Sequence, residues 1–419
     1  MFSGAARSWR ENRYSKDHNV ESHLFPALPL VFSDTVLFGA LVVIGMIAGE
    51  IANRLRLPRI TGYILAGIAI GPWVSALALK PLLSEERIFV DIALGLVMFD
   101  LGRRIDLDWF ERDRSLAAAS FMEIVCCASA VFLLLRYFGF TPLESAVGAA
   151  IGISTSPAVL LLVARDVHAE GQVTERSLAL VAVNSLIAMF AVTMLFAAAH
   201  FEYRSSWTLV VLHPLYLFFG SVVVGAVAAV AAVEMGRLLG KREQAQFALM
   251  VALVLIAVGV AHALKLSVLL ALLVFGITSR RLDRNNHLIE VDWGNAAQLF
   301  YVVLFVITGA GLPLSALSTA GWLALAYVGA RAFGKWLGVL AVAPFSTLRV
   351  RQSAWLGAAL LPMSGVAIVL IHDVTSLFPE FGKLAEVLLA AALYMELAGP
   401  IVVMLALRSA GETPQEETS

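Results

Sequence analysis

Two long apolar stretches of the sequence each contain a short interruption by helix-breaking and hydroxyl residues. The first interruption reads Ser154-Thr155-Ser156-Pro157, and the second reads Pro362-Met363-Ser364-Gly365. Unwound backbone in hydrocarbon costs several kcal/mol per unsatisfied group, so it persists only within protein or beside water. A single interruption is typical of a tolerated proline kink. Two interruptions at matching places favour a pair of broken helices around a hydrated site.

A third stretch carries two adjacent polar residues near its middle, Asn184 and Ser185. Together with the hydroxyl groups of Ser154, Thr155, Ser156 and Ser364, they offer oxygen ligands of the kind that hard cations prefer. The sequence therefore predicts a Na⁺ or K⁺ site near Thr155, Asn184 and Ser185. Ordinary hydrogen bonds between helices are the alternative explanation of the same residues.

Two cations, Arg331 and Lys335, lie four residues apart in an apolar stretch and so share one helical face. A charge at the centre of a membrane helix costs roughly 2.5–3.5 kcal/mol on insertion scales, which makes such residues functional candidates. These cations need a carboxylate, an anion or a helix C-terminus nearby. Glu396 and Glu123 are the candidate carboxylates, either as proton carriers or as static ion-pair partners.

Composition identifies the class of protein. The chain has 419 residues, of which 60% are hydrophobic and 15% charged, and its net charge is −1. A soluble core cannot bury so much apolar surface, and the balanced charge excludes a nucleic-acid footprint. The adjacent Cys126 and Cys127 have no metal-ligand spacing, and motifs of hydrolases and nucleotide-binding enzymes are absent. We therefore expect a membrane protein that is not an enzyme, has no cofactor and does not bind nucleic acid.

Apolar runs long enough to cross a bilayer recur along the chain. They lie at about 34–53, 60–79, 86–102, 115–138, 143–164, 174–200, 209–239, 243–263, 266–282, 292–312, 316–345, 352–372 and 383–408. The interruptions fall in the fifth and twelfth runs. The two runs are seven spans apart, an odd number, so the second unit must be inverted relative to the first. We therefore predict an all-α polytopic membrane protein of about thirteen transmembrane helices, with inverted six-span repeats and two broken helices that cross.

The predicted domain organisation follows from this division. A polar N-terminal segment, 1–33, precedes a transmembrane domain over 34–408. The domain consists of a first repeat (34–200), a linking span (209–239) and an inverted repeat (243–408), and a short tail (409–419) follows. Most Lys and Arg residues of the short loops fall in alternate loops, beginning with Arg54, Arg56 and Arg59. The positive-inside rule then places the N-terminus outside and the C-terminus in the cytoplasm, as expected for a bacterial inner (plasma) membrane.

Several motifs resemble those of the monovalent cation:proton antiporter superfamily, in the branch of Kef-type potassium efflux proteins. The resemblance is carried by Gly62-Tyr63 to Gly71-Pro72, Phe99-Asp100-Leu101-Gly102, Ser154 to Pro157 and Phe305 to Ala310. It covers residues 34–408. It implies a thirteen-span inverted-repeat fold, in which spans four to six and eleven to thirteen move against a dimerisation domain. It also implies a homodimer in the lipid bilayer that exchanges Na⁺ or K⁺ for protons by alternating access.

The sequence departs from this family in the sixth span and in the twelfth, where Met363-Ser364-Gly365 replaces a charged stretch of the family. Members commonly carry an Asp in the middle of span six, and counting from Ser154-Thr155 places that position at Ser185, after Asn184. One hypothesis is an antiporter whose proton carboxylate has moved, to Glu396 or, as the reserve candidate, to Glu123. The other is a non-canonical relative that transports another solute, or a membrane sensor that does not transport.

Overall fold

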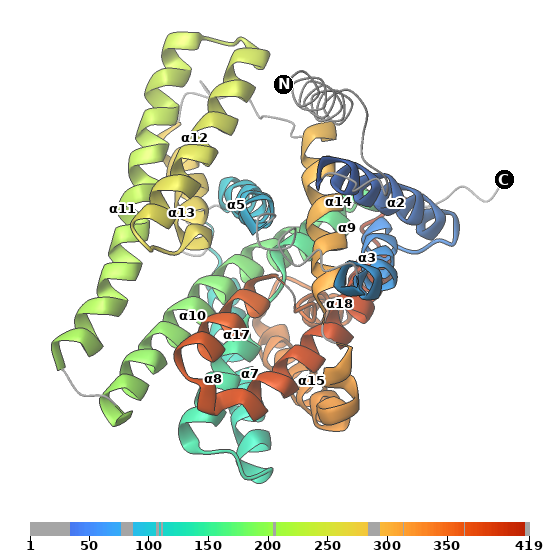
Figure 1. Ribbon diagram of the computed structural model, residues 1–419, viewed down its shortest axis with the longest axis vertical. Helices are drawn as coiled ribbons and strands as arrows, with labels where there is room; N and C mark the ends of the chain where they lie inside the picture. Colours follow the sequence, from blue (N-terminus) through green and yellow to red (C-terminus); the bar gives the residue numbers. More distant parts are fainter. Residues whose placement is uncertain are drawn as a thin grey trace, which may run out of the picture.

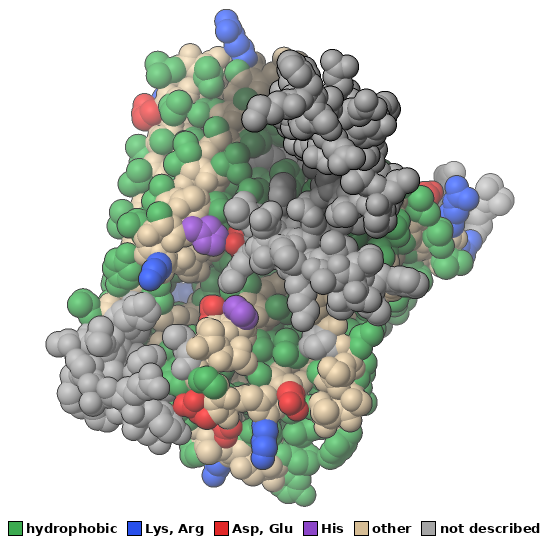
Figure 2. Space-filling view, viewed as in Figure 1, with side chains coloured by type: hydrophobic (Ala, Val, Ile, Leu, Met, Phe, Trp, Pro, Cys, Tyr) green, Lys and Arg blue, Asp and Glu red, His purple; other side chains and the backbone are tan. Residues whose placement is uncertain are grey.

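The structure, a computed structural model, describes residues 34–76, 87–105, 109, 112–203, 207–283, 294–312, 314–363 and 365–414. The described part is helical, with no strand in these ranges (Figure 1). On the face seen in Figure 2, hydrophobic side chains are spread over the described part, and charged ones are sparse. Seven helices are long and apolar enough to cross a membrane by themselves, and shorter apolar helices accompany them. The predicted all-α polytopic membrane fold is confirmed. The predicted N-terminal segment 1–33 lies outside the described residues.

Each of the thirteen predicted spans corresponds to one helix or to one broken pair. The continuous helices are α2 (Asp34–Arg54), α3 (Arg59–Ala76), α5 (Arg87–Arg104), α7 (Arg114–Tyr137), α10 (Gln172–Tyr203), α11 (Trp207–Leu239), α12 (Glu243–Ala263), α13 (Val268–Leu282), α14 (Gly294–Gly311), α15 (Ser315–Val342) and α18 (Gly382–Ala410). The broken pairs are α8 (Pro142–Ile153) with α9 (Pro157–Asp166), and α16 (Val350–Ala359) with α17 (Gly365–Leu377).

The helices form two groups, which we call the crossing bundle and the scaffold. The crossing bundle contains the two broken pairs with α7, α10, α15 and α18, and it fills the lower part of Figure 1. The scaffold contains α2, α3, α5 and α11 to α14. Within it α5 packs along α13, and α3 packs along α14. In the predicted repeats, α3 and α5 are the second and third spans of the first unit, and α13 and α14 are the second and third spans of the second unit. The two contacts are therefore equivalent, as inverted repeats require. The residue limits of the repeats remain a prediction.

Glycines allow the scaffold helices to touch. A Cβ on Gly67 would lie 2.1 Å from the carbonyl oxygen of Val306, and one on Gly309 would lie 2.4 Å from that of Ile64. A Cβ there would collide with backbone that cannot move aside. Close backbone approach at small residues is the usual basis of helix association in lipid.

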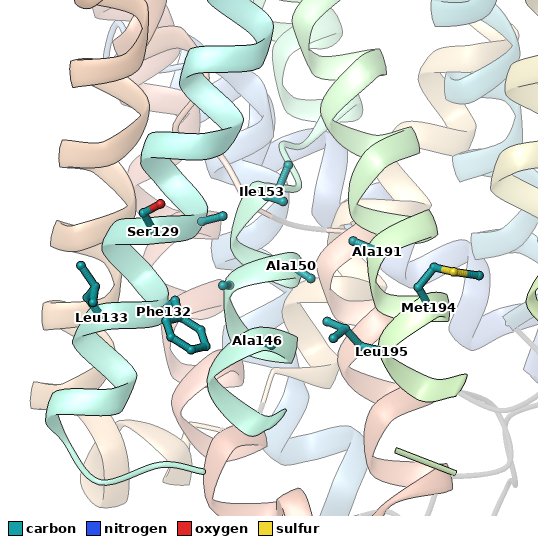
Figure 3. Close-up of a pocket in the computed structure, with 11 residues that line it drawn as sticks. Ser129, Phe132, Leu133, Ala146, Ala150, Ile153, Ala191, Met194 and Leu195 are labelled. Carbon is teal, nitrogen blue, oxygen red and sulfur yellow. The ribbon is translucent and has the colours of Figure 1, made fainter. Parts of the chain in front are cut away.

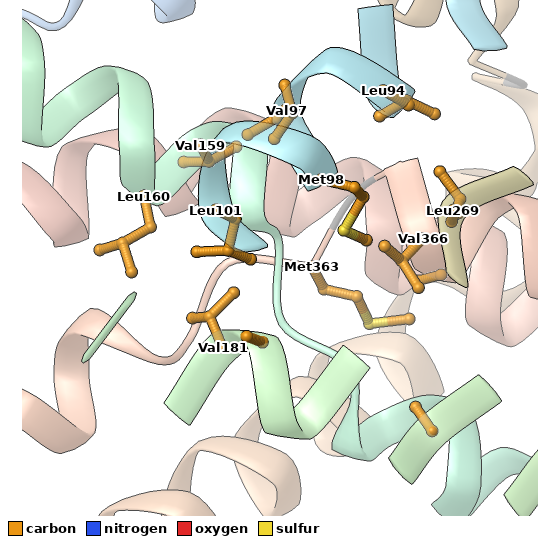
Figure 4. Close-up of a cluster of buried hydrophobic side chains, with 14 of the residues drawn as sticks. Leu94, Val97, Met98, Leu101, Val159, Leu160, Val181, Leu269, Met363 and Val366 are labelled. Carbon is orange, nitrogen blue, oxygen red and sulfur yellow. The ribbon is translucent and has the colours of Figure 1, made fainter. Parts of the chain in front are cut away.

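A cluster of buried apolar side chains joins the two groups (Figure 4). Met98 and Leu101 of α5 lie close to Val159 of α9 and Val181 of α10. Met363, in the second break, is fully buried beside them. The unwound segments are therefore enclosed by protein rather than exposed to lipid, which is the condition for their persistence.

The chain end adds one contact that the sequence did not predict. After α18, Gly411 has a left-handed backbone with a φ of 80°. Glu412 then accepts hydrogen bonds from the amides of Val173 (2.6 Å) and Thr174 (2.8 Å), at the start of α10. A carboxylate at a helix N-terminus satisfies amides that have no partner within the helix. The tail thus ties α18 to α10. The last predicted tail residues, 415–419, lie outside the described part.

Candidate functional site

The two interruptions of the sequence are breaks in helices, and the breaks contact each other. The amide of Ser156 donates to the carbonyl oxygen of Pro362 at 2.9 Å. The hydroxyl of Thr155 donates to the carbonyl oxygen of Leu360 at 3.1 Å. Ser156 also caps α9, because its hydroxyl accepts from the amide of Val159. Polar backbone freed at each break is thus partly satisfied by the other break.

The remaining residues predicted at the breaks are placed as follows. Ser154 is buried, and its hydroxyl donates to the carbonyl oxygen of Ile151 at 2.7 Å. Pro157 is the first residue of α9, where its missing amide hydrogen costs nothing. Gly365 is the first residue of α17, and a Cβ there would lie 2.7 Å from the side chain of Leu94. Ser364 lies outside the described residues.

Arg331, on α15, satisfies the backbone at both breaks. Its Nε donates to the carbonyl oxygen of Gly152 at 2.7 Å, and its Nη2 donates to that of Ser154 at 2.5 Å. Its Nη1 donates to the carbonyl oxygen of Leu361. These carbonyls lie at the C-terminal ends of α8 and α16, where helices leave acceptors free and carry partial negative charge. Of the partners that the sequence left open for Arg331, the helix C-terminus is therefore the one observed.

Lys335 forms a buried ion pair with Glu123 of α7. Its ammonium donates to Oε1 of Glu123, and both side chains are 0% exposed. The same ammonium donates to the carbonyl oxygen of Ile153 at 2.9 Å and to the hydroxyl of Thr155 at 3.1 Å. The carboxylate that meets Lys335 is thus Glu123, the reserve candidate of the sequence. Glu396, the first candidate, is fully buried in α18.

Asn184 and Ser185 of α10 complete the group. The amide nitrogen of Asn184 donates to Oε1 of Glu123 at 3.2 Å and to the hydroxyl of Thr155 at 3.4 Å. The hydroxyl of Ser185 donates to the carbonyl oxygens of Val181 at 2.8 Å and Thr155 at 3.4 Å. The structure therefore brings together Thr155, Asn184, Ser185, Glu123 and Lys335.

Two oxygen atoms at this site have no hydrogen-bond partner among the described residues. They are Oε2 of Glu123 and Oδ1 of Asn184, and both are buried. Buried acceptors without donors are uncommon and mark a place for water or an ion. A carboxylate and an amide oxygen suit a hard cation. In the described ranges no three His, Cys, Asp or Glu side chains gather as a metal-binding group.

Sequence reasoning missed two contributors. The hydroxyl of Tyr327 donates to the carbonyl oxygen of Gly148 at 2.8 Å, and the thiol of Cys127 contacts that of Gly152 at 3.4 Å. Tyr327 lies four residues before Arg331, and Cys127 lies four residues after Glu123. This spacing puts each on the same helical face as its charged neighbour, so the signal was present in the sequence.

Two ion pairs join the crossing bundle to the scaffold at the end of α9. Arg165 donates to Asp100 of α5 at 2.7 Å. The guanidinium of Arg59 of α3 lies 3.7 Å from Asp166, which also accepts from the backbone amide of Arg59 at 3.1 Å. Arg103 and Arg104 follow Asp100 closely along the chain. Arg104 does lie 3.8 Å from Asp100, but the contact with Arg165 is shorter.

The chain was compared with known proteins. The family model described as the transmembrane sodium/hydrogen exchanger matches residues 39–408. A structure of the sodium proton antiporter MjNhaP1 from Methanocaldococcus jannaschii at pH 8 aligns with a TM-score of 0.68 and 18% identity, over 90% of this chain and 99% of that one. An electron-microscopy map of the same antiporter aligns with a TM-score of 0.66 and 16% identity, over 90% and 96%. At these identities the likeness concerns the fold alone.

The curated proteins that match include the following one. It is an uncharacterized protein in the phaC 3′ region of Methylorubrum extorquens, 30% identical over 90 residues. The aligned part is 22% of this chain and only 32% of the length of that relative.

Proposed function

The chain belongs to the sodium/hydrogen exchanger family of membrane transporters, and on this premise we propose that it exchanges a monovalent cation, Na⁺ or K⁺, for protons by alternating access. One observation carries the proposal. The buried pair of Lys335 and Glu123 lies at the crossing of the two broken helices, beside two buried oxygens without hydrogen-bond donors in the described part of the chain.

Competition for Glu123 couples the two fluxes in this proposal. The cation binds between Oε2 of Glu123 and Oδ1 of Asn184, with Thr155 and Ser185 close by. The ammonium of Lys335 occupies the other carboxylate oxygen. Two positive charges a few Å apart repel strongly in a site of low dielectric constant. The bound cation therefore favours loss of the proton from Lys335, and reprotonation of Lys335 expels the cation.

The charges also suggest the stoichiometry. With the cation bound, Glu123 is negative, the cation is positive and Lys335 is neutral. With the proton bound, Glu123 is negative and Lys335 is positive. The net charge is the same in both states, because Arg331 stays protonated throughout. We therefore propose exchange of one cation for one proton, without net movement of charge.

Glu396 remains a predicted proton carrier. It is buried in α18, the span that corresponds to α10 in the inverted half. If it carried a proton in addition to the one on Lys335, the two states would differ in charge. The exchange would then respond to the membrane potential, so this response distinguishes the two arrangements.

The setting of the transporter is part of the proposal. We propose a homodimer in the bacterial inner membrane, with the N-terminus outside and the C-terminus in the cytoplasm. The distribution of Lys and Arg among the loops supports this orientation. The resemblance to cation:proton antiporters supports the dimer.

The second candidate function is transport of another solute, or sensing without transport. One observation favours it, namely that Ser185 stands where the family resemblance leads us to expect an Asp. Binding separates these functions from monovalent cation exchange. A ligand that binds only the folded protein raises its melting temperature, so Na⁺ or K⁺ should raise the Tm of the detergent-solubilised chain.

Transport is tested in proteoliposomes that contain a pH-sensitive dye. We expect addition of Na⁺ or K⁺ outside acidic vesicles to raise the internal pH, because protons leave as the cation enters. Choline at the same concentration is the control for ionic strength. Absence of a response to every monovalent cation, from protein that retains its Tm, would contradict the proposal and favour the second candidate.

A further inference from the structure

An apolar groove lies between α7, α8 and α10 (Figure 3). Its cavity volume is about 640 Å³, within the range of about 300–1,000 Å³ that is typical of small-molecule sites. α8 forms the floor and packs against both neighbours, and α7 and α10 form the walls. Small residues of α8, Ala146, Ala149 and Ala150, leave the space between them.

The lining favours hydrocarbon rather than water. Ser129 is the one polar side chain among its lining residues, and Phe132, Leu195 and Met194 are among the others. Apolar cavities of this kind do not hold ordered water, because water there would lose its hydrogen bonds. The groove is therefore suited to an apolar ligand.

The surroundings of the groove identify that ligand as lipid. Leu133 of α7 lines the groove and is 66% exposed. Phe190 of α10, which precedes the lining residue Ala191, is 44% exposed. Exposed apolar side chains on membrane-spanning helices face the acyl chains of the bilayer. The groove runs from Ala146 to Ile153, about 10 Å along α8 at about 1.5 Å per residue. The end of a lipid acyl chain can therefore enter from the bilayer and lie along α8.

A cation lies at the outer end of this groove. Arg136 is four residues beyond Phe132, on the same face of α7, and is exposed. One of its nitrogens donates to the carbonyl oxygen of Phe140. The start of α8, with its partial positive charge, lies at the same end. Glu144 is also there, and its carboxylate is turned back to the amide of Thr141 at 2.8 Å. A phosphate is the lipid group that matches Arg136.

We propose that this groove binds one phospholipid, with the end of an acyl chain along α8 and the phosphate at Arg136. The deep end of the groove is Ile153, whose carbonyl oxygen accepts from the ammonium of Lys335. The bound acyl chain thus keeps water away from this side of the Lys335–Glu123 pair. The lipid forms part of the crossing bundle and moves with it. The proposal does not depend on which solute is transported.

Photochemical crosslinking tests the site. The full chain is reconstituted in nanodiscs with a phospholipid that carries a diazirine near the end of one acyl chain, and adducts are mapped by peptide mass spectrometry. Excess unlabelled phospholipid distinguishes a saturable site from the surrounding bilayer. We expect saturable adducts on residues 128–133, 146–153 and 191–195. Labelling of the exposed face of α11 around Val227 should follow only the fraction of labelled lipid.

Two variants fill the groove from different helices, one from the floor and one from a wall, so that failure of one to fold does not remove the test. Ala146→Phe and Ala191→Phe should each abolish the saturable adducts, whereas Val227→Phe, on the exposed face of α11, should leave them unchanged. Arg136→Gln should reduce the saturable adducts, because the labelled phospholipid loses its phosphate contact. Folding of each variant is checked by its Tm. Adducts in the groove that do not saturate, or that persist in both well-folded filling variants, would overturn the proposal.

Discussion

The ammonium of Lys335 bonds to the carboxylate of Glu123 where neither side chain is accessible to solvent. The same ammonium reaches Ile153 and Thr155, at the end of a broken helix. A single cation therefore links α15, α7 and the first break. An ion pair in this position stabilises the fold only while both partners are charged, which makes it sensitive to a competing cation.

Removal of Arg331 should destabilise the crossing without acting directly on the exchanged ions. In Arg331→Lys the charge remains, but the three carbonyl oxygens of Gly152, Ser154 and Leu361 each bond a different nitrogen of the planar guanidinium, and the shorter lysine side chain with its single nitrogen does not reproduce that spacing. Each buried acceptor left without a donor costs about 1–3 kcal/mol. We expect a lower Tm of the solubilised protein, with an unchanged preference among cations in the protein that remains folded.

Arg237→Lys is the matched control, because Arg237 is 44% exposed on α11 and pairs only with Glu234 among the described residues. A surface pair contributes about 0–1 kcal/mol. An Arg331→Lys protein with the wild-type Tm and an altered cation preference would show instead that Arg331 acts on the ions.

Addition of a carboxylate at Ser185 should make the exchange sensitive to the membrane potential. In Ser185→Asp the site holds a second acid beside Thr155 and Asn184. If this carboxylate is ionised while the cation is bound and takes up a proton when the cation leaves, the two states differ in net charge by one. We expect the wild type to respond equally at clamped potentials of either sign, and the variant to respond faster at one sign. The measurement is dye-reported proton flux in proteoliposomes with potassium and valinomycin setting the potential.

Ser185→Asn is the control for this experiment, because it has nearly the size of Asp without its charge. A potential-dependent flux in the wild type itself would contradict one-for-one exchange while leaving cation exchange intact. It would direct attention to Glu396 as a second carrier.

Asp113, whose carboxylate caps the N-terminus of α7, should make the stability of the protein depend on pH. Burial acts to raise the pKa of Asp113, but bonds from Ser115 and Leu116 and the charge of Arg176 outweigh it, and the pKa is lowered from its ordinary value. A carboxyl whose pKa is lowered by folding stabilises the protein above its unfolded pKa of about 3.9 and loses that contribution as pH falls through the folded value.

Asp113→Asn keeps a good helix cap but removes the charge. We expect its Tm to lie below that of the wild type at pH 7, because Arg176 loses its anionic partner. The difference should shrink as pH falls below about 4, where the carboxyl of the unfolded chain takes up a proton, and disappear once the folded carboxyl, whose pKa is lower, is protonated too. A Tm difference that stays constant from pH 7 to the acid limit of folding would argue against this role of Asp113.

The sequence was sufficient to predict the spans and both breaks, because the cost of placing backbone in hydrocarbon depends on local residues. Pro157 and Gly365 indicated where α9 and α17 begin. The partner of Lys335 could not be predicted in the same way. Glu123 lies 212 residues away in the chain, and no local pattern distinguished it from Glu396, since each is flanked on both sides by apolar residues. Which of the two acids meets Lys335 depends on how α7 and α18 pack against α15.

The contact between Arg165 and Asp100 was missed for the same reason. Arg103 and Arg104 are close to Asp100 in sequence, and Arg165 becomes its nearest cationic partner only through the packing of α9 on α5. For Arg331 the sequence left three kinds of partner open, namely a carboxylate, an anion and a helix C-terminus. The helix C-terminus could be identified only from the positions of the ends of α8 and α16.

The central claim, that Glu123 carries the exchanged cation, is tested most directly by cation-driven proton flux of Glu123→Gln in proteoliposomes. Removal of one partner of a buried ion pair costs about 3–5 kcal/mol, so the double variant Glu123→Gln with Lys335→Gln serves as a version without an unpaired charge. Glu386→Gln, an exposed change on α18, is the control, and Glu396→Gln is measured beside it. We predict that both Glu123 variants lose the response to Na⁺ and K⁺ while Glu386→Gln keeps it. A wild-type response in folded Glu123→Gln would contradict the claim, and its loss in Glu396→Gln alone would transfer the role to Glu396.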